Sequence, residues 1–292
     1  MRTIHVRTKR YPTRGRLRRA VQALLMIGGL YVLMGTLTGQ WLPPGLAPAP
    51  TATPIALTTP APTPHPDQTA QDMQEAQDSA LVLQRQSWYA ISFGVFGTRK
   101  DAEGAGANYV QRGAAGYVLE EDGFYLLSSA YPLREEADAV REQLRTQHQI
   151  DSTIYPLAAE EVELRVTASP LQISALGQGF ALLPEMIEEL SRLSLALDRQ
   201  TMDVAAVTAA AGNNFARIAA LRTTLSLSLG SSKSGIVTGL LSLLSESEKA
   251  MENISAQKGA TVLELSAKIK YNHLDVLWKY VQYVRQMTAY RV

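Results

Sequence analysis

Side chains that commonly act in catalysis are scarce in this chain. The sequence contains four histidines and no cysteine, and His148 and His273 are the histidines in the parts expected to fold. Without cysteine there is no thiol nucleophile, disulfide or Cys-ligated zinc. Asp275 lies two residues after His273, and side chains at that spacing do not share a helix face. We interpret His273 as a structural or surface histidine, and a metal-dependent hydrolase, which needs several His and Glu ligands, is not expected.

Two glycine-bearing segments could suggest nucleotide binding, but neither has the required spacing. The segment Gly230-Ser-Ser-Lys-Ser-Gly235 does not fit the GxxxxGK(S/T) pattern of a phosphate-binding loop. A helix C-cap followed by a serine N-cap explains it better. Gly177-Gln-Gly179 lacks a third glycine and a preceding strand. The sequence therefore predicts no enzyme, no catalytic residue, no cofactor and no metal site.

The most patterned stretch, residues 88–157, contains two similar halves. The first begins WYAISFGVFGTRKDA and the second FYLLSSAYPLREEA. Tyr89 aligns with Tyr125, and Ser92 aligns with Ser128. After a gap of one residue, Arg99 aligns with Arg134 and Ala102 with Ala137. Each half reads as strand, helix, strand. Two such units in tandem predict a βαββαβ, ferredoxin-like domain.

Period-two alternation in the first strand places Tyr89, Ile91 and Phe93 on one face and Trp88, Ala90 and Ser92 on the other. Helices are expected near residues 98–111 and 133–146, each with an apolar stripe. Both helices should pack on one side of the sheet. The opposite face is then expected to stay open, as a surface for binding.

The segment Tyr89–Ala102, YAISFGVFGTRKDA, resembles the first strand, turn and helix start of a SPOR domain, and Tyr125–Ala137 resembles its second copy. The resemblance covers about a quarter of the chain. It implies binding to septal peptidoglycan, in particular to glycan strands stripped of their peptides, and a role in cell division, sporulation or cell-wall organisation. Two positions depart from the family pattern: Ser92 replaces a Gln that contributes to the glycan surface, and Ala130 replaces a Gly.

The resemblance also assigns candidate site residues. The positions that match the family's contact strands and turns are Ser92, Gly94, Val95, Phe96, Ser128 and Tyr131. Three further aromatic residues could provide platforms for sugar rings: Trp88, Tyr117 and Tyr155. Core packing is the alternative interpretation of each aromatic, especially Phe96 and Tyr155.

The N-terminus has the pattern of a membrane anchor. Residues 1–19 carry eight Arg or Lys and no acid, and residues 20–42 carry no charge. A span of that length can cross a bilayer as a helix. The positive-inside bias places the basic end in the cytoplasm and the rest outside. A cleaved signal peptide is the competing interpretation, although its apolar region is usually shorter.

The linker after this span is expected to cover residues 43–87. It is rich in Pro, Ala and Thr up to residue 66 and predicts a semi-rigid polyproline spacer. Residues 67–87 are interpreted as a polar helix or a continued linker.

Charge argues against nucleic acid as a partner. Residues 88–157 hold six basic and ten acidic side chains, and the chain after residue 157 holds thirteen of each. A nucleic-acid binder carries its basic patch on the folded domain. An RNA-recognition module, which shares the βαββαβ order, would also need stacking aromatics with basic neighbours.

Residues 160–169 are interpreted as a charged connector. The C-terminal part, residues 170–292, predicts an all-α helical bundle. A short helix is expected over 171–182, with Pro184 opening the next one. Apolar residues then recur at helical spacing up to Met287. Four amphipathic helices with short connections suggest an up-down bundle.

Two functional hypotheses follow. In the first, a single-pass protein of the cell membrane binds peptidoglycan glycan through the SPOR-like domain, and the bundle recruits division or sporulation proteins. In the second, the protein is a structural scaffold whose bundle makes the contacts and whose SPOR-like domain no longer binds glycan. A peptidoglycan hydrolase is a third, weaker alternative.

Overall fold

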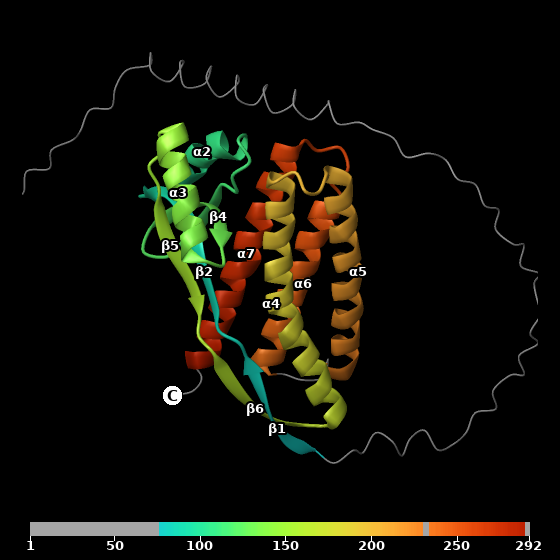
Figure 1. The fold of residues 1–292 in the computed structure, drawn as a ribbon. Helices are drawn as coiled ribbons and strands as arrows, with labels where there is room; N and C mark the ends of the chain where they lie inside the picture. Colours follow the sequence, from blue (N-terminus) through green and yellow to red (C-terminus); the bar gives the residue numbers. More distant parts are fainter. Residues whose placement is uncertain (1–75, 230–233, 290–292) are drawn as a thin grey trace, which may run out of the picture. The chain divides into compact units, whose positions relative to one another are not determined.

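The computed structural model describes residues 76–229 and 234–289. Contacts divide the chain into two units, Met1–Pro66 and Asp67–Val292, and the described residues belong to the second. These residues form six helices and two antiparallel sheets, so the predicted α+β class is confirmed (Figure 1). The expected membrane span, residues 20–42, lies outside them. Among the helices that the structure describes, none is long and apolar enough to cross a bilayer.

A four-stranded antiparallel sheet occupies the repeated region. Its strand order is β3-β4-β2-β5. The strands are β2 (Gln86–Phe96), β3 (Tyr117–Glu120), β4 (Phe124–Tyr131) and β5 (Thr153–Ala159). Helices α2 (Arg99–Val110) and α3 (Arg134–His148) follow β2 and β4. The predicted repeat of strand, helix and strand is therefore present, with both helices close to their expected bounds.

Helix α2 packs on one face of this sheet. Thr98 caps it, since its Oγ1 accepts a hydrogen bond from the backbone N–H of Asp101 at 3.1 Å. Gly106 permits a close approach, because a Cβ at this position would lie 3.1 Å from Cδ1 of Leu126. The rings of Phe93 and Tyr109 meet with centroids 4.1 Å apart.

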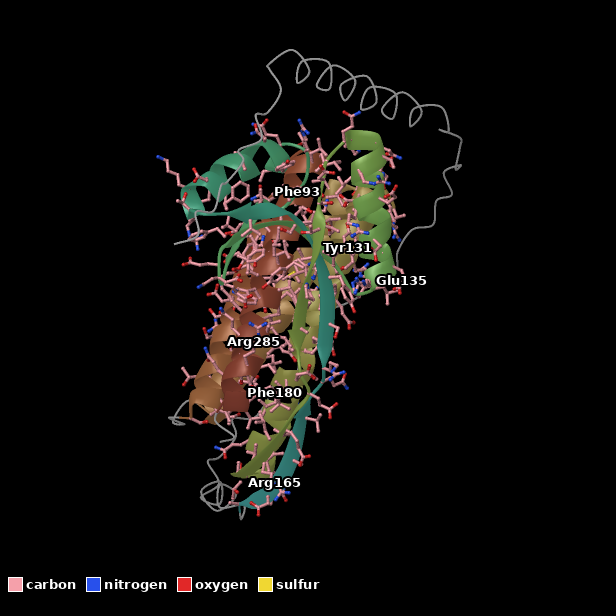
Figure 2. All side chains as sticks on the ribbon, turned by 90° about the vertical axis from the view of Figure 1, so that its left-hand side faces the viewer. Phe93, Tyr131, Glu135, Arg165, Phe180 and Arg285 are labelled. Atoms are coloured by element: carbon pink, nitrogen blue, oxygen red, sulfur yellow. The ribbon has the colours of Figure 1, made fainter. Side chains whose placement is uncertain are left out.

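The sheet continues into a two-stranded ribbon that the sequence did not predict. Strand β1 (Gln77–Leu83) pairs with β6 (Val162–Ala168). One register runs through both sheets, from Ser92 opposite Thr153 to Gln77 opposite Ala168. Figure 2 shows the ribbon extending past Phe180 toward Arg165. The interpretation of residues 77–83 as polar helix or linker is wrong, and the segment after residue 160 is a strand where a charged connector was expected.

Four long helices form the C-terminal part. They are α4 (Pro170–Asp198), α5 (Val204–Leu229), α6 (Gly235–Ser255) and α7 (Val262–Ala289), and they run alternately up and down (Figure 1). The predicted four-helix arrangement is therefore confirmed for the described residues.

Helix α4 is continuous through Pro184, where two separate helices were expected. Proline lacks the N–H that would bond to the carbonyl of Phe180, and its ring disfavours a straight helix at this point. Leu182, Leu183, Met186 and Ile187 are nevertheless all buried around it. Burying side chains of this size is worth roughly 1.5–3 kcal/mol each, which outweighs a helix penalty of about 3 kcal/mol.

Candidate ligand-binding face of the sheet

The face opposite α2 is covered by α7 of the helical part. Trp88 of β2 meets His273 edge to face, with ring centroids 4.8 Å apart. Tyr117 of β3 meets Tyr271 with centroids 5.3 Å apart, and its hydroxyl donates to Oδ1 of Asp275 at 3.5 Å. Trp88 is 3 % exposed and Tyr117 is 8 % exposed. The expectation of an open sheet face is therefore wrong, because the chain's own last helix packs there.

Polar contacts fix α7 in this position. The ammonium group of Lys270 pairs with Asp198 of α4 at 2.8 Å and donates to the carbonyl of Gly113, just after α2, at 2.9 Å. Ser266 donates to Oδ1 of Asp198 at 2.6 Å. Gly113 has φ of 84°, a conformation that favours glycine. One network of hydrogen bonds and an ion pair therefore joins α4, α7 and the loop after α2.

Burial along this interface shifts the pKa values of His273 and Tyr117. Burial lowers the pKa of His273 to about 3, and Nε2 of this ring has no hydrogen-bond partner in the described part of the chain. The pKa of Tyr117 is raised, first by burial and then by the nearby Asp275 carboxylate. A neutral imidazole enclosed in this way is a packing element of the interface.

Two of the candidate glycan-binding positions, Ser92 and Ser128, are buried, and Tyr131 is partly buried. Ser92 is 2 % exposed, and its hydroxyl contacts the backbone of Gly94. Ser128 is 5 % exposed and lies 3.3 Å from the hydroxyl of Ser129. The hydroxyl of Tyr131 accepts from Ser129 at 3.3 Å, and burial raises the Tyr131 pKa.

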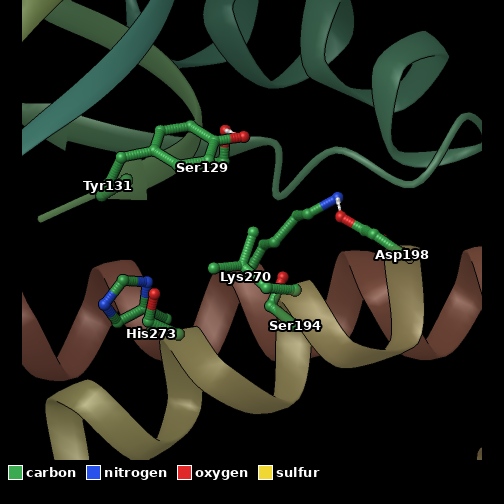
Figure 3. Close-up of a pocket in the computed structure, with 9 residues that line it drawn as sticks. Ser129, Tyr131, Ser194, Asp198, Lys270 and His273 are labelled. Atoms are coloured by element: carbon green, nitrogen blue, oxygen red, sulfur yellow. Dashed lines mark hydrogen bonds and ion pairs between the residues drawn. The ribbon is translucent and has the colours of Figure 1, made fainter. Parts of the chain in front are cut away.

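A small hollow beside Tyr131 is the space left between the sheet and the helices. Its volume is about 10 Å³. Figure 3 shows Ser129 and Tyr131 facing Ser194, Lys270 and His273 across it. A hollow of this size holds at most one water-sized group, so it cannot admit a sugar ring.

The other candidate positions lie at the accessible end of the sheet. Val95 is 58 % exposed, and Gly94 and Phe96 beside it are partly exposed. Tyr155 is also partly exposed and contacts the ring of Tyr125 at a tilted angle of 52°, with ring centroids 4.7 Å apart. The structure therefore separates the predicted residues into a buried group and an exposed group, instead of one continuous surface.

The exposed group includes residues that the sequence did not single out as site residues. Tyr155 hydrogen-bonds to Glu121, whose other carboxylate oxygen pairs with Arg285 of α7 at 2.8 Å. Burial, followed by the Glu121 contact, raises the pKa of Tyr155. We call Val95, Phe96, Tyr125 and Tyr155 the aromatic corner. Tyr125 and Tyr155 are visible in the sequence as aromatic strand residues, but their link to Arg285 through Glu121 depends on the tertiary packing.

No cluster of three or more His, Asp or Glu side chains that could hold a metal ion occurs among the described residues. Comparison with protein-family models, with curated proteins and with solved structures gives no match for this chain.

Proposed function

We propose that this protein is a non-catalytic, membrane-anchored scaffold built on a SPOR-like domain that has given up glycan binding on its sheet face. The strand order β3-β4-β2-β5, with α2 and α3 after β2 and β4, supports a ferredoxin-like split βαβ domain. The repeat in the sequence and the resemblance to SPOR domains support the same assignment.

The observation that carries the proposal is the packing of α7 on the predicted binding face. Trp88 and Tyr117, two of the expected sugar platforms, contact His273 and Tyr271 of that helix. A glycan strand could reach this face only if α7 left it. Such a step would expose Leu274, Leu277 and other buried side chains of α7, at a cost of roughly 25 cal/mol per Å² of apolar surface.

In this proposal the N-terminal segments give the scaffold its location. Residues 20–42 cross the cell membrane once, with residues 1–19 in the cytoplasm. The linker places the folded part outside the membrane, near the wall. Division or sporulation proteins are the proposed partners, and nucleic acid is not one of them.

The aromatic corner favours a second candidate, which is glycan binding through the exposed end of the sheet. Two partly exposed tyrosines in contact, beside the ion pair of Glu121 and Arg285, are groups that can contact a sugar ring and its hydroxyls. This surface is smaller than the whole face that the resemblance implies.

Co-sedimentation of the full chain, in detergent, with cell-wall sacculi separates the two candidates. Sacculi treated with an amidase present glycan stripped of peptides, and untreated sacculi are the control. The scaffold predicts the same low pelleted fraction with both. Pelleting with treated sacculi only, reduced by Tyr125→Ala and Tyr155→Ala, would replace the scaffold with the second candidate.

A further inference from the structure

One edge of strand β1 has no partner strand among the described residues. Within the described residues β1 pairs with β6 on one side only. The corresponding edge of β2 is paired with β4 in the four-stranded sheet, but that pairing begins at Tyr89 opposite Tyr131. Alternate N–H and C=O groups of Gln77–Leu83 therefore point away from β6, and such an edge can accept another strand.

A groove of about 360 Å³ lies between this strand and α4. Leu81 and Val82 both line it. Because consecutive residues of a strand point to opposite faces, a groove lined by both must run along the edge of β1. No residue of β6 lines it. Its volume lies in the range of ordinary ligand pockets.

The wall formed by α4 is mainly apolar. Phe180 and Pro184 lie one turn apart on the same side of α4, and both line the groove. Gly177 allows the helix close to the strand, because a Cβ there would lie 3.7 Å from Cδ2 of Leu81. Val82 remains 52 % exposed. An apolar side chain of an added strand could pack on Leu81 and Pro184, which are both partly exposed.

The charge at the rim of the groove is negative. Glu185 and Glu188 both line it. Glu185 pairs with Arg217 of α5 at 2.6 Å, whereas Glu188 makes no ion pair within the described ranges. A basic side chain on the occupant would complement Glu188.

The chain's own neighbouring segments lack that complementarity. Residues 67–75 contain three acidic and no basic side chains, and β1 itself contains Asp78 and no basic residue. Neither the preceding segment nor the β1 strand of a second copy therefore fits beside Glu188.

We propose that the groove receives an extended segment of a partner protein, added as a strand to the free edge of β1. The segment has aliphatic side chains at alternate positions, which pack against Leu81 and Pro184 on the α4 side of the ribbon, and a Lys or Arg opposite Glu188. Backbone hydrogen bonds supply affinity, and the alternate side chains supply specificity. This inference rests on the scaffold function and names its docking surface.

The probe is a phage-displayed library of random octapeptides, selected on the immobilised full chain. The expected consensus has aliphatic residues at alternate positions together with Lys or Arg. Amide hydrogen exchange in Gln77–Leu83 slows when a selected peptide is added. Glu188→Lys weakens the selected peptides about tenfold and shifts a repeated selection toward Asp and Glu.

Glu252→Lys is the matched control, because Glu252 is an exposed glutamate on α6 without an ion pair in the described part of the chain. It should leave the consensus and the affinity unchanged. The proposal is overturned if the selection enriches no peptide, or if the selected peptides do not have aliphatic residues at alternate positions. It is also overturned if Glu188→Lys leaves the charge preference of the selected peptides unchanged. Dimerisation in sedimentation that Glu188→Lys abolishes would instead assign the groove to a second copy. Because the sacculus assay uses the sheet and not this groove, failure of either proposal can be recognised separately.

Discussion

Trp88 and His273 meet edge to face, with ring centroids 4.8 Å apart and an angle of 74° between the ring planes. One belongs to the first strand of the repeated region and the other to the last helix. Both rings are almost fully buried. This contact places the predicted binding face of the sheet and the helical part in one shared core.

Removing the Trp88 ring tests that shared core. Trp88→Ala should lower the free energy of unfolding by about 3–5 kcal/mol, because a large buried side chain is lost. Helix and strand signals should still disappear in one urea transition. Tyr271→Ala is the control; Tyr271 is 44 % exposed, and its loss should cost less. Two separate transitions in the wild type would show that the sheet and the bundle unfold independently.

His273 should make stability fall in weak acid. Its pKa is about 3 in the folded protein, whereas an unfolded histidine has a pKa of about 6.5. Between these values the unfolded chain binds a proton that the folded chain does not. Unfolding free energy therefore decreases as pH falls through about 6.5, by up to about 1.4 kcal/mol per pH unit.

The variant His273→Phe lacks this titration. Urea unfolding between pH 7 and pH 5, where ordinary carboxylates remain mostly ionised, should show a smaller dependence on pH than in the wild type. The comparison uses slopes, so a uniform loss of stability in the variant does not affect it. Equal slopes would mean that the imidazole is not held neutral in the interface.

The ion pair of Lys270 and Asp198 should couple α4 to α7. Lys270→Met removes the cation from the partly buried Asp198 carboxylate, which keeps its hydrogen bond from Ser266, and we expect a loss of about 1–3 kcal/mol after allowing for solvent at Asp198. Adding Asp198→Asn should recover part of it, as measured by a double-mutant cycle. Lys249→Met removes an exposed pair and should cost less than about 0.5 kcal/mol. If the free-energy changes of Lys270→Met and Asp198→Asn simply add, the two side chains do not interact.

Two glycines of α6 form a matched pair for testing how α6 packs on α7. At Gly239 a Cβ would lie 2.4 Å from the Tyr283 ring, whose hydroxyl donates to the carbonyl of Ile236 at 2.8 Å. Gly239→Ala should cost about 1–3 kcal/mol by overpacking. At Gly235 no described atom lies within 4 Å of an added Cβ, so Gly235→Ala should be neutral or slightly stabilising in thermal unfolding. The opposite ranking would contradict this interface.

Local periodicity was enough to predict the repeat and its two helices. Alternation in β2 correctly separated Ile91 from Trp88, since neighbouring strand residues point to opposite faces. The ribbon was missed although β6, VELRVTA, alternates apolar and polar residues. Its charged side chains suggested a connector, and its partner β1 lies far away in the sequence. Long-range pairing of this kind leaves no local signal beyond the alternation itself.

The position of α7 was missed for a related reason. The sequence showed one apolar stripe through Leu265, Val276 and Val284, which suffices for packing in a bundle. Leu274, Leu277, Trp278 and Val281 add a second buried side. A helix that is apolar on more than one side needs more than one partner. These additional apolar residues are visible in the sequence, and they indicate that α7 packs against a second partner besides the bundle.

The occupancy of the sheet face can be measured directly, because the chain contains no cysteine. Ser92→Cys and Val95→Cys each introduce a single thiol, at positions that are 2 % and 58 % exposed. A maleimide should modify the Val95→Cys protein rapidly and the Ser92→Cys protein only after unfolding in urea. Rapid modification of folded Ser92→Cys, at a rate near that of Val95→Cys, would contradict the covered face and with it the proposed scaffold.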